Sequence, residues 1–141
     1  MKTLQTLTAA VLIILSTSAF AIDETATEKL SINYALQTYL DALSYGKIKG
    51  LSEIMDKDAK LTMNDGKKII TFNKAEILKT LKYAENTSQN CDTQFEVIEQ
   101  SASQTIVKVT LKYPDFYRVN FISLSSTSTG WKITNISSVF K

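Results

Sequence analysis

The sequence predicts an α+β domain in which a curved antiparallel sheet wraps around a long N-terminal helix and carries two shorter helices. Two observations predict this class. After residue 22, apolar residues first recur every three or four positions, as on one face of a helix. In the second half of the chain, apolar residues alternate with polar ones, as in a sheet with one buried and one solvent-exposed face. Helices followed by a run of strands are typical of α+β domains.

The first helix is expected from about Ala26 to Tyr45. Thr25 and Glu28 have the spacing of a capping box, in which each side chain binds a free backbone N–H group. Gly46 can end the helix in a left-handed conformation. The apolar stripe of this helix contains Ile32, Ala35, Leu36, Tyr39, Leu40 and Leu43.

Two shorter helices are expected, one over residues 48–55 and one opened by the capping pair Asn73 and Glu76. Asn64-Asp65-Gly66 predicts a hairpin turn. Strands are expected over residues 59–64, 67–72, 91–100, 105–113, 116–123 and 131–140.

The first 21 residues are predicted to be a signal peptide, which leaves residues 22–141 as one domain. Lys2 precedes the apolar run Ala9–Leu15, and Ala19-Phe20-Ala21 is a small-x-small cleavage site. A membrane anchor is the alternative, but a spanning helix needs about 20 apolar residues. We therefore expect export to the periplasm or the cell exterior, with cleavage after Ala21 and no stable membrane anchor.

Composition excludes several classes of site. Removal of Lys2 leaves 15 of the 16 basic residues against 14 acidic ones, which gives no electrostatic case for nucleic acid. The chain has no His, so His-based nucleophile pairs and His metal sites are excluded. Its four glycines form no phosphate-binding loop. We expect no metal and no cofactor.

Cys91 is the only cysteine, so it forms no intrachain disulfide. It is interpreted as a small, half-buried residue at the start of a strand. The alternative is an intermolecular disulfide in an oxidising compartment.

Two segments resemble the nuclear transport factor 2-like superfamily, which includes polyketide cyclases and ketosteroid isomerases. Leu36–Thr62 (LQTYLDALSYGKIKGLSEIMDKDAKLT) is similar to its opening helix and first strand, and Gly130–Phe140 (GWKITNISSVF) is similar to its closing strand. Within the superfamily the chain is most similar to the secreted group labelled "putative lumazine-binding". Lys47 and Lys49 depart from the acidic caps that are usual there.

The resemblance also bears on catalysis. Ketosteroid isomerases use a helix Tyr and a strand Asp, and their positions match Tyr39 and Met63. A thioether takes no proton, so the base is missing and a non-catalytic domain is favoured. One alternative is an isomerase or dehydratase with Asp65 as base and Tyr39 as hydrogen-bond donor. Tyr39 as a simple core aromatic is the other.

The sheet and the long helix would enclose a cone that suits a small apolar or aromatic ligand. Close packing of the same side chains into a filled core is the alternative. A third hypothesis is a homodimeric interaction module that pairs through the outer face of the sheet, with Thr110, Lys112, Arg118 and Asn120. The expected cone-lining residues are Tyr34, Tyr39, Met55, Met63, Phe95, Tyr113, Phe121 and Trp131.

Overall fold

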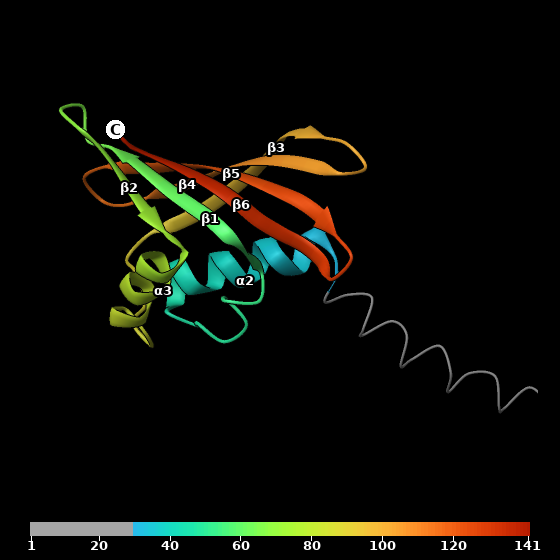
Figure 1. The fold of residues 1–141 in the computed structure, drawn as a ribbon. Coiled ribbons are helices and arrows are strands. Elements are labelled where there is room, and N and C mark those ends of the chain that lie inside the picture. The colour runs from blue at the N-terminus through green and yellow to red at the C-terminus, as the bar shows by residue number, and fades with distance from the viewer. Residues whose placement is uncertain (1–29) are drawn as a thin grey trace, which may run out of the picture.

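A computed structural model describes residues 30–141, which form a sheet packed on one helix, with a second helix at one end (Figure 1). The predicted signal peptide and the Thr25–Glu28 capping box lie outside the described residues. Chain order is α2 (Ile32–Tyr45), β1 (Met55–Asn64), β2 (Ile69–Asn73), α3 (Lys74–Tyr83), β3 (Asp92–Gln100), β4 (Gln104–Lys112), β5 (Tyr117–Thr127) and β6 (Gly130–Phe140).

The sheet is mixed, so the expectation of an entirely antiparallel sheet is wrong. Its six strands have the order β2-β1-β6-β5-β4-β3. Strand β1 pairs in parallel with β6, with Leu61 beside Ile136, and every other neighbouring pair is antiparallel. The chain crosses from the β1–β2 hairpin through α3 to the far edge, and then returns strand by strand until β6 reaches β1. This return forces β6 to run in the direction of β1.

Helix α2 lies under the sheet and supplies the centre of the core. The Ser31 side chain caps its first turn by accepting a 3.1 Å hydrogen bond from the N–H of Tyr34. Gly46 ends it at a φ of 66°, as expected from the sequence. Space also requires glycine here, because an added Cβ would lie 2.2 Å from the carbonyl oxygen of Ala84.

The helix expected over residues 48–55 is not formed. Hydrogen-bonded turns follow Gly46 instead, and Met55 already belongs to β1, beside Ile133. Gly50, like Gly46, has a positive φ (81°), a conformation that breaks helical geometry within a single turn. Of the two shorter helices, the structure therefore contains the second only.

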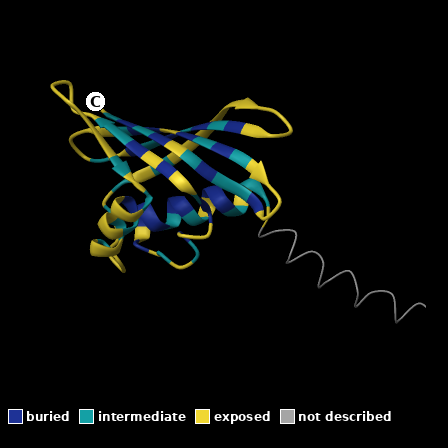
Figure 2. Ribbon diagram, viewed as in Figure 1, coloured by how far each residue is buried: buried dark blue, intermediate teal, exposed yellow. Residues whose placement is uncertain are grey.

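Helix α3 begins as predicted. The Asn73 side chain accepts a hydrogen bond from the N–H of Glu76, and the Glu76 carboxylate accepts one from the N–H of Asn73. Only Ile77 of this helix is fully buried, so most of α3 is exposed (Figure 2). Neither helix described in residues 30–141 combines the length and the apolar character needed to cross a bilayer.

The core lies between α2 and the face of the sheet that looks toward it, here called the inner face. Buried and exposed residues alternate along β4, β5 and β6 because successive side chains point to opposite faces (Figure 2). The fully buried side chains on these strands include Val107, Val109, Leu111, Asn120, Ile122, Leu124, Ile133, Ile136 and Ser138.

Candidate functional site

A pocket of about 130 Å³ opens between α2, α3 and the first hairpin of the sheet. Most of its wall is apolar, and three polar side chains interrupt it. The apolar wall is made by Leu43, Leu61, Met63, Phe72, Ile77 and Leu81, and the polar groups belong to Tyr39, Thr80 and Arg118.

Periodicity brings these residues together. Leu61 and Met63 are two apart on β1 and share its inner face, and Phe72 of β2 lies opposite Leu61. Ile77 and Leu81 are one helical turn apart on α3, so both face the hairpin. The capping box of α3 thus positions one wall of the pocket.

The polar end of the pocket continues into a buried chain of hydrogen bonds across β5 and β6. Arg118 Nε donates to Ser138 Oγ at 2.9 Å, and Ser138 Oγ donates to Asn120 Oδ1 at 2.7 Å. Asn120 Nδ2 then donates to the Tyr39 hydroxyl at 3.4 Å. Asn120 and Ser138 are each 0% exposed, and both are satisfied by this chain.

Tyr39 is a neutral group near physiological pH. Burial raises its pKa to about 12, although the nearby Arg118 charge and the Asn120 hydrogen bond both act to lower it. Its hydroxyl therefore keeps its proton and can donate a hydrogen bond. The phenolate, which is the form that could act as a base, is scarcely populated near neutral pH.

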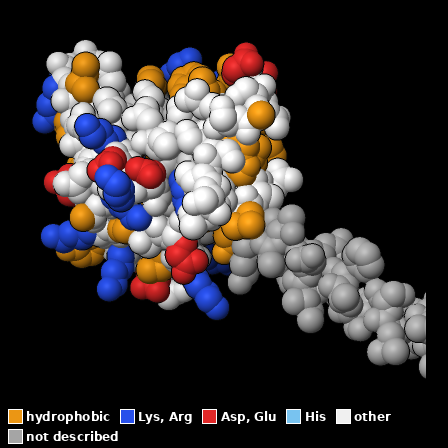
Figure 3. All heavy atoms as spheres, turned by 45° about the vertical axis from the view of Figure 1, so that its right-hand side comes forward, with side chains coloured by type: hydrophobic (Ala, Val, Ile, Leu, Met, Phe, Trp, Pro, Cys, Tyr) orange, Lys and Arg blue, Asp and Glu red, His pale blue; other side chains and the backbone are white. Residues whose placement is uncertain are grey.

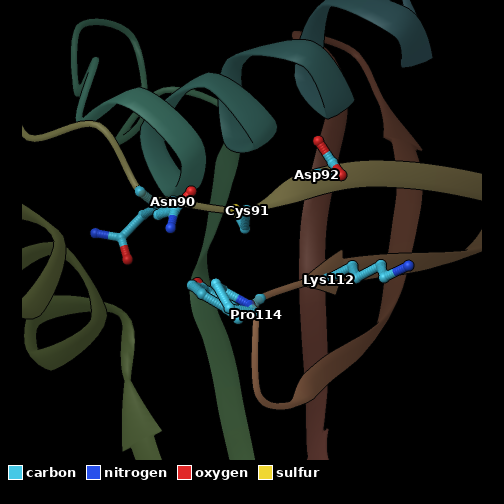
Figure 4. A pocket seen from close by; sticks show the side chains of 7 residues that line it. Asn90, Cys91, Asp92, Lys112 and Pro114 are labelled. Atoms are coloured by element: carbon cyan, nitrogen blue, oxygen red, sulfur yellow. The ribbon is translucent and has the colours of Figure 1, made fainter.

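A second, shallow pocket of about 270 Å³ lies at the start of β3 and the end of β4. Its Cys91 side chain points from the start of β3 toward the β4–β5 turn, which contains Pro114 (Figure 4). Cys91 is a half-buried free thiol, as the first interpretation expected. Burial raises the pKa of the neighbouring Tyr113 above its ordinary value. The remaining lining residues, Gln89, Asn90, Asp92 and Lys112, are polar.

The eight residues expected to line one cone lie in different parts of the structure. Tyr39 and Met63 line the first pocket, and Tyr113 lines the second. Met55 is buried in the core, while Tyr34 and Trp131 pack against it.

The expectation is wrong for Phe121, which is 39% exposed, whereas Phe95 is 54% exposed and lines neither pocket. Phe121 lies between Lys108 and Ser137 on the outer face of the sheet. Phe95 pairs with the buried Val109, but it belongs to the edge strand β3, where no further strand covers it.

Asp65 does not reach the pocket. It lies exposed in the turn between β1 and β2, where one carboxylate oxygen accepts hydrogen bonds from the N–H groups of Lys67 and Lys68. These bonds lower the pKa of Asp65 below its ordinary value, which weakens it further as a base. The alternative of an isomerase or dehydratase thereby loses its base.

Sequence reasoning missed Arg118, Asn120 and Ser138. It placed Arg118 and Asn120 on the outer face, and both point inward instead. The signal was the position of Asn120 and Arg118, two and four residues before the core residue Ile122 on the same strand. This signal was hidden because the alternate positions of β5 also carry apolar side chains, Val119 and Phe121, which point to the outer face. A homodimer stays a prediction, now without these two residues at its interface.

Charges on the surface are mixed. Lys and Arg side chains lie beside Asp and Glu side chains on the face in Figure 3, and apolar side chains form separate groups there. Within residues 30–141, no three His, Cys, Asp or Glu side chains are grouped as metal ligands.

Comparisons with known proteins agree with this fold. Residues 27–140 match the family model described as "Putative lumazine-binding". No functionally curated protein matches the sequence. A nuclear transport factor 2-like protein of unknown function from Silicibacter pomeroyi is 12% identical, with a TM-score of 0.67 over 83% of this chain and 98% of that one.

A second such protein, from Methylobacillus flagellatus, is 16% identical, with a TM-score of 0.57 over 78% of this chain and 89% of that one. A third, from Rhodospirillum rubrum and described as of unknown function in nutrient uptake, is 15% identical, with a TM-score of 0.60 over 78% and 98%. This chain belongs to the "Putative lumazine-binding" family, and its fold is similar to that of nuclear transport factor 2-like proteins.

Proposed function

We propose that this protein binds a small, largely apolar ligand in the pocket between α2, α3 and the β1–β2 hairpin. The observation that carries the proposal is the composition of that pocket, which six apolar and three polar side chains line. This combination is typical of small-molecule sites, where apolar contact supplies affinity and a few polar groups fix orientation.

Size restricts the ligand. An apolar cavity of about 150 Å³ holds one benzene molecule, and this pocket measures about 130 Å³. One ring or a short branched chain therefore fits within it. A fused two-ring compound such as lumazine would have to extend out of the pocket.

Binding without catalysis is the role that the lining residues favour. None of the nine lining residues described is Asp, Glu, Cys or His. Tyr39 has a pKa of about 12, and an arginine stays protonated throughout the physiological range. No lining group can therefore exchange a proton efficiently near neutral pH. The expected export of the protein would place this binding outside the cytoplasm.

Thermal-shift and native mass spectrometry of residues 22–141 test the proposal. The compounds are single-ring aromatics, short branched aliphatics and two-ring pterin-like compounds that include lumazine. Binding at 100 times the dissociation constant adds about 2.7 kcal/mol of stability. Met63→Trp should fill the pocket and abolish binding, whereas Phe121→Trp, on the outer face, should not. Absence of binding across all three classes, or equal binding by both variants, would refute the proposal.

A further inference from the structure

Arg118 is the only arginine among the 141 residues, and it is the only charged side chain that lines the first pocket. Strand β5 places it there, near the start of the strand and on the face that carries Asn120 and Ile122. Its guanidinium carbon lies 5.7 Å from the centre of the Phe140 ring, in a cation–π contact. A partly buried cation in an apolar wall is unfavourable without a compensating charge.

The protein itself does not supply that charge. Within residues 30–141, the only ion pair closer than 4.0 Å joins Lys57 and Asp58, which lie in exposed positions. A guanidinium carries five N–H groups in a flat fork. The Nε group of Arg118 donates to Ser138, and the described residues provide no carboxylate for the other four.

The charge also sets the direction of the buried hydrogen-bond chain. An arginine side chain can only donate hydrogen bonds, so the Ser138 hydroxyl must accept one from it. That hydroxyl then donates its own hydrogen bond to Asn120 Oδ1. The amide nitrogen of Asn120 must then face Tyr39 and donate to its hydroxyl. The hydroxyl proton of Tyr39 is not used in this chain, and Tyr39 lines the same pocket as Arg118.

Both polar groups at this end of the pocket are therefore hydrogen-bond donors, and one of them is a cation. We infer that the ligand is a small monocarboxylate, whose carboxylate accepts hydrogen bonds from Arg118 and Tyr39 while a single ring or short branched chain fills the apolar wall. Planar guanidinium groups bind carboxylates through two parallel hydrogen bonds. This inference rests on the proposed function and adds the chemical class of the ligand.

Matched acids and amides test the inference, because they have nearly the same shape and differ in charge. The pairs are benzoate with benzamide, and 3-methylbutanoate with 3-methylbutanamide, measured by calorimetry on residues 22–141 at pH 7. At least one acid should bind about tenfold or more tightly than its amide, as expected for hydrogen bonds to a charged group. Added salt should reduce this preference.

Two charge-removing variants locate the effect. Arg118→Gln should abolish the preference for the acid, because it removes the charge that distinguishes a carboxylate from an amide. Lys60→Gln removes an equal charge from an exposed position of β1 and should leave the preference intact. Should Arg118→Gln fail to fold, Arg118→Lys retains the charge without the flat fork and should lower acid affinity selectively.

The outcomes separate the two proposals. Equal affinity of acid and amide, or a preference for the acid that survives Arg118→Gln, overturns the carboxylate inference and leaves the binding function standing. Binding of neutral rings without binding of either acid would also overturn the carboxylate inference and leave the binding function standing. If no compound of any class binds, the proposed function itself is refuted.

Discussion

The side-chain amide of Asn120 donates a hydrogen bond to the hydroxyl of Tyr39, 81 residues earlier in the chain. This contact ties the first described helix to the inner face of β5 beneath the pocket. Burial of the Tyr39 phenol raises its pKa to about 12, although this hydrogen bond acts to lower it. Stability should therefore depend on the protonation of Tyr39 at high pH.

Alkaline unfolding should reveal this dependence. The pKa of about 12 in the folded protein exceeds the ordinary tyrosine value of 10.0, so the contribution is fully present below pH 10 and is lost as pH rises toward 12. The loss should be roughly 3 kcal/mol in the free energy of unfolding. In Tyr39→Phe this component should be missing, whereas Tyr45→Phe, at an exposed site, should retain it. Urea titrations between pH 8 and 12 measure it, and identical curves for both variants would contradict the assignment.

Gly46 should be intolerant of a side chain. Its φ of 66° is costly for other residues, and an added Cβ would meet the backbone of Ala84 and Asn86. Gly66 has a similar φ of 85° but open space around it, so Gly66→Ala is the matched control for backbone strain alone. We expect Gly46→Ala to lose at least about 1 kcal/mol more than Gly66→Ala in chemical denaturation. Equal losses would mean that the loop after α3 moves away freely.

Asn73→Ala should weaken α3 and, through it, the pocket. Removal of the cap leaves the N–H of Glu76 without its partner, at a cost of about 1 kcal/mol in unfolding free energy. Ile77 and Leu81 stand on that helix, so ligand affinity should fall as well. Glu76→Gln retains an acceptor for the N–H of Asn73 and should cost much less. Thermal denaturation with and without ligand distinguishes the two effects.

We propose that the chain is processed after Ala21 in the cell that produces it. Intact-mass analysis should then find a mature protein that begins at Ile22. Ala21→Arg should accumulate as precursor because the peptidase requires a small residue there, whereas Phe20→Leu should be cleaved normally. A cytosolic protein that still begins at Met1 would contradict export.

Local chemistry explains which parts of the fold could be predicted. The cap at Asn73 and the helix end at Gly46 depend on residues adjacent in sequence, and both were predicted. The alternation of Leu61 and Met63 with polar residues likewise predicted a strand, which the structure contains as part of β1.

Local sequence could not predict which side chains of β5 point toward the core. Among residues 117–123, both the odd-numbered and the even-numbered positions include apolar side chains. Only the neighbouring strands decide which of these two faces of β5 is buried. Arg118 and Asn120 were misplaced for this reason. The parallel pairing of β1 with β6 depends on contacts between distant segments, which no local pattern records.

The central place of β6 has a consequence for folding kinetics. This strand leaves the ribosome after the other five, yet it joins the β2-β1 hairpin to the β5-β4-β3 meander. The hairpin and the meander can form from local contacts, but they cannot become one sheet until residues 130–140 arrive. Closure of so long a loop costs chain entropy before it yields contacts, so this step should limit the folding rate. Until then the chain has two partial sheets with open edges, and a truncation at residue 129 would leave it permanently in that state.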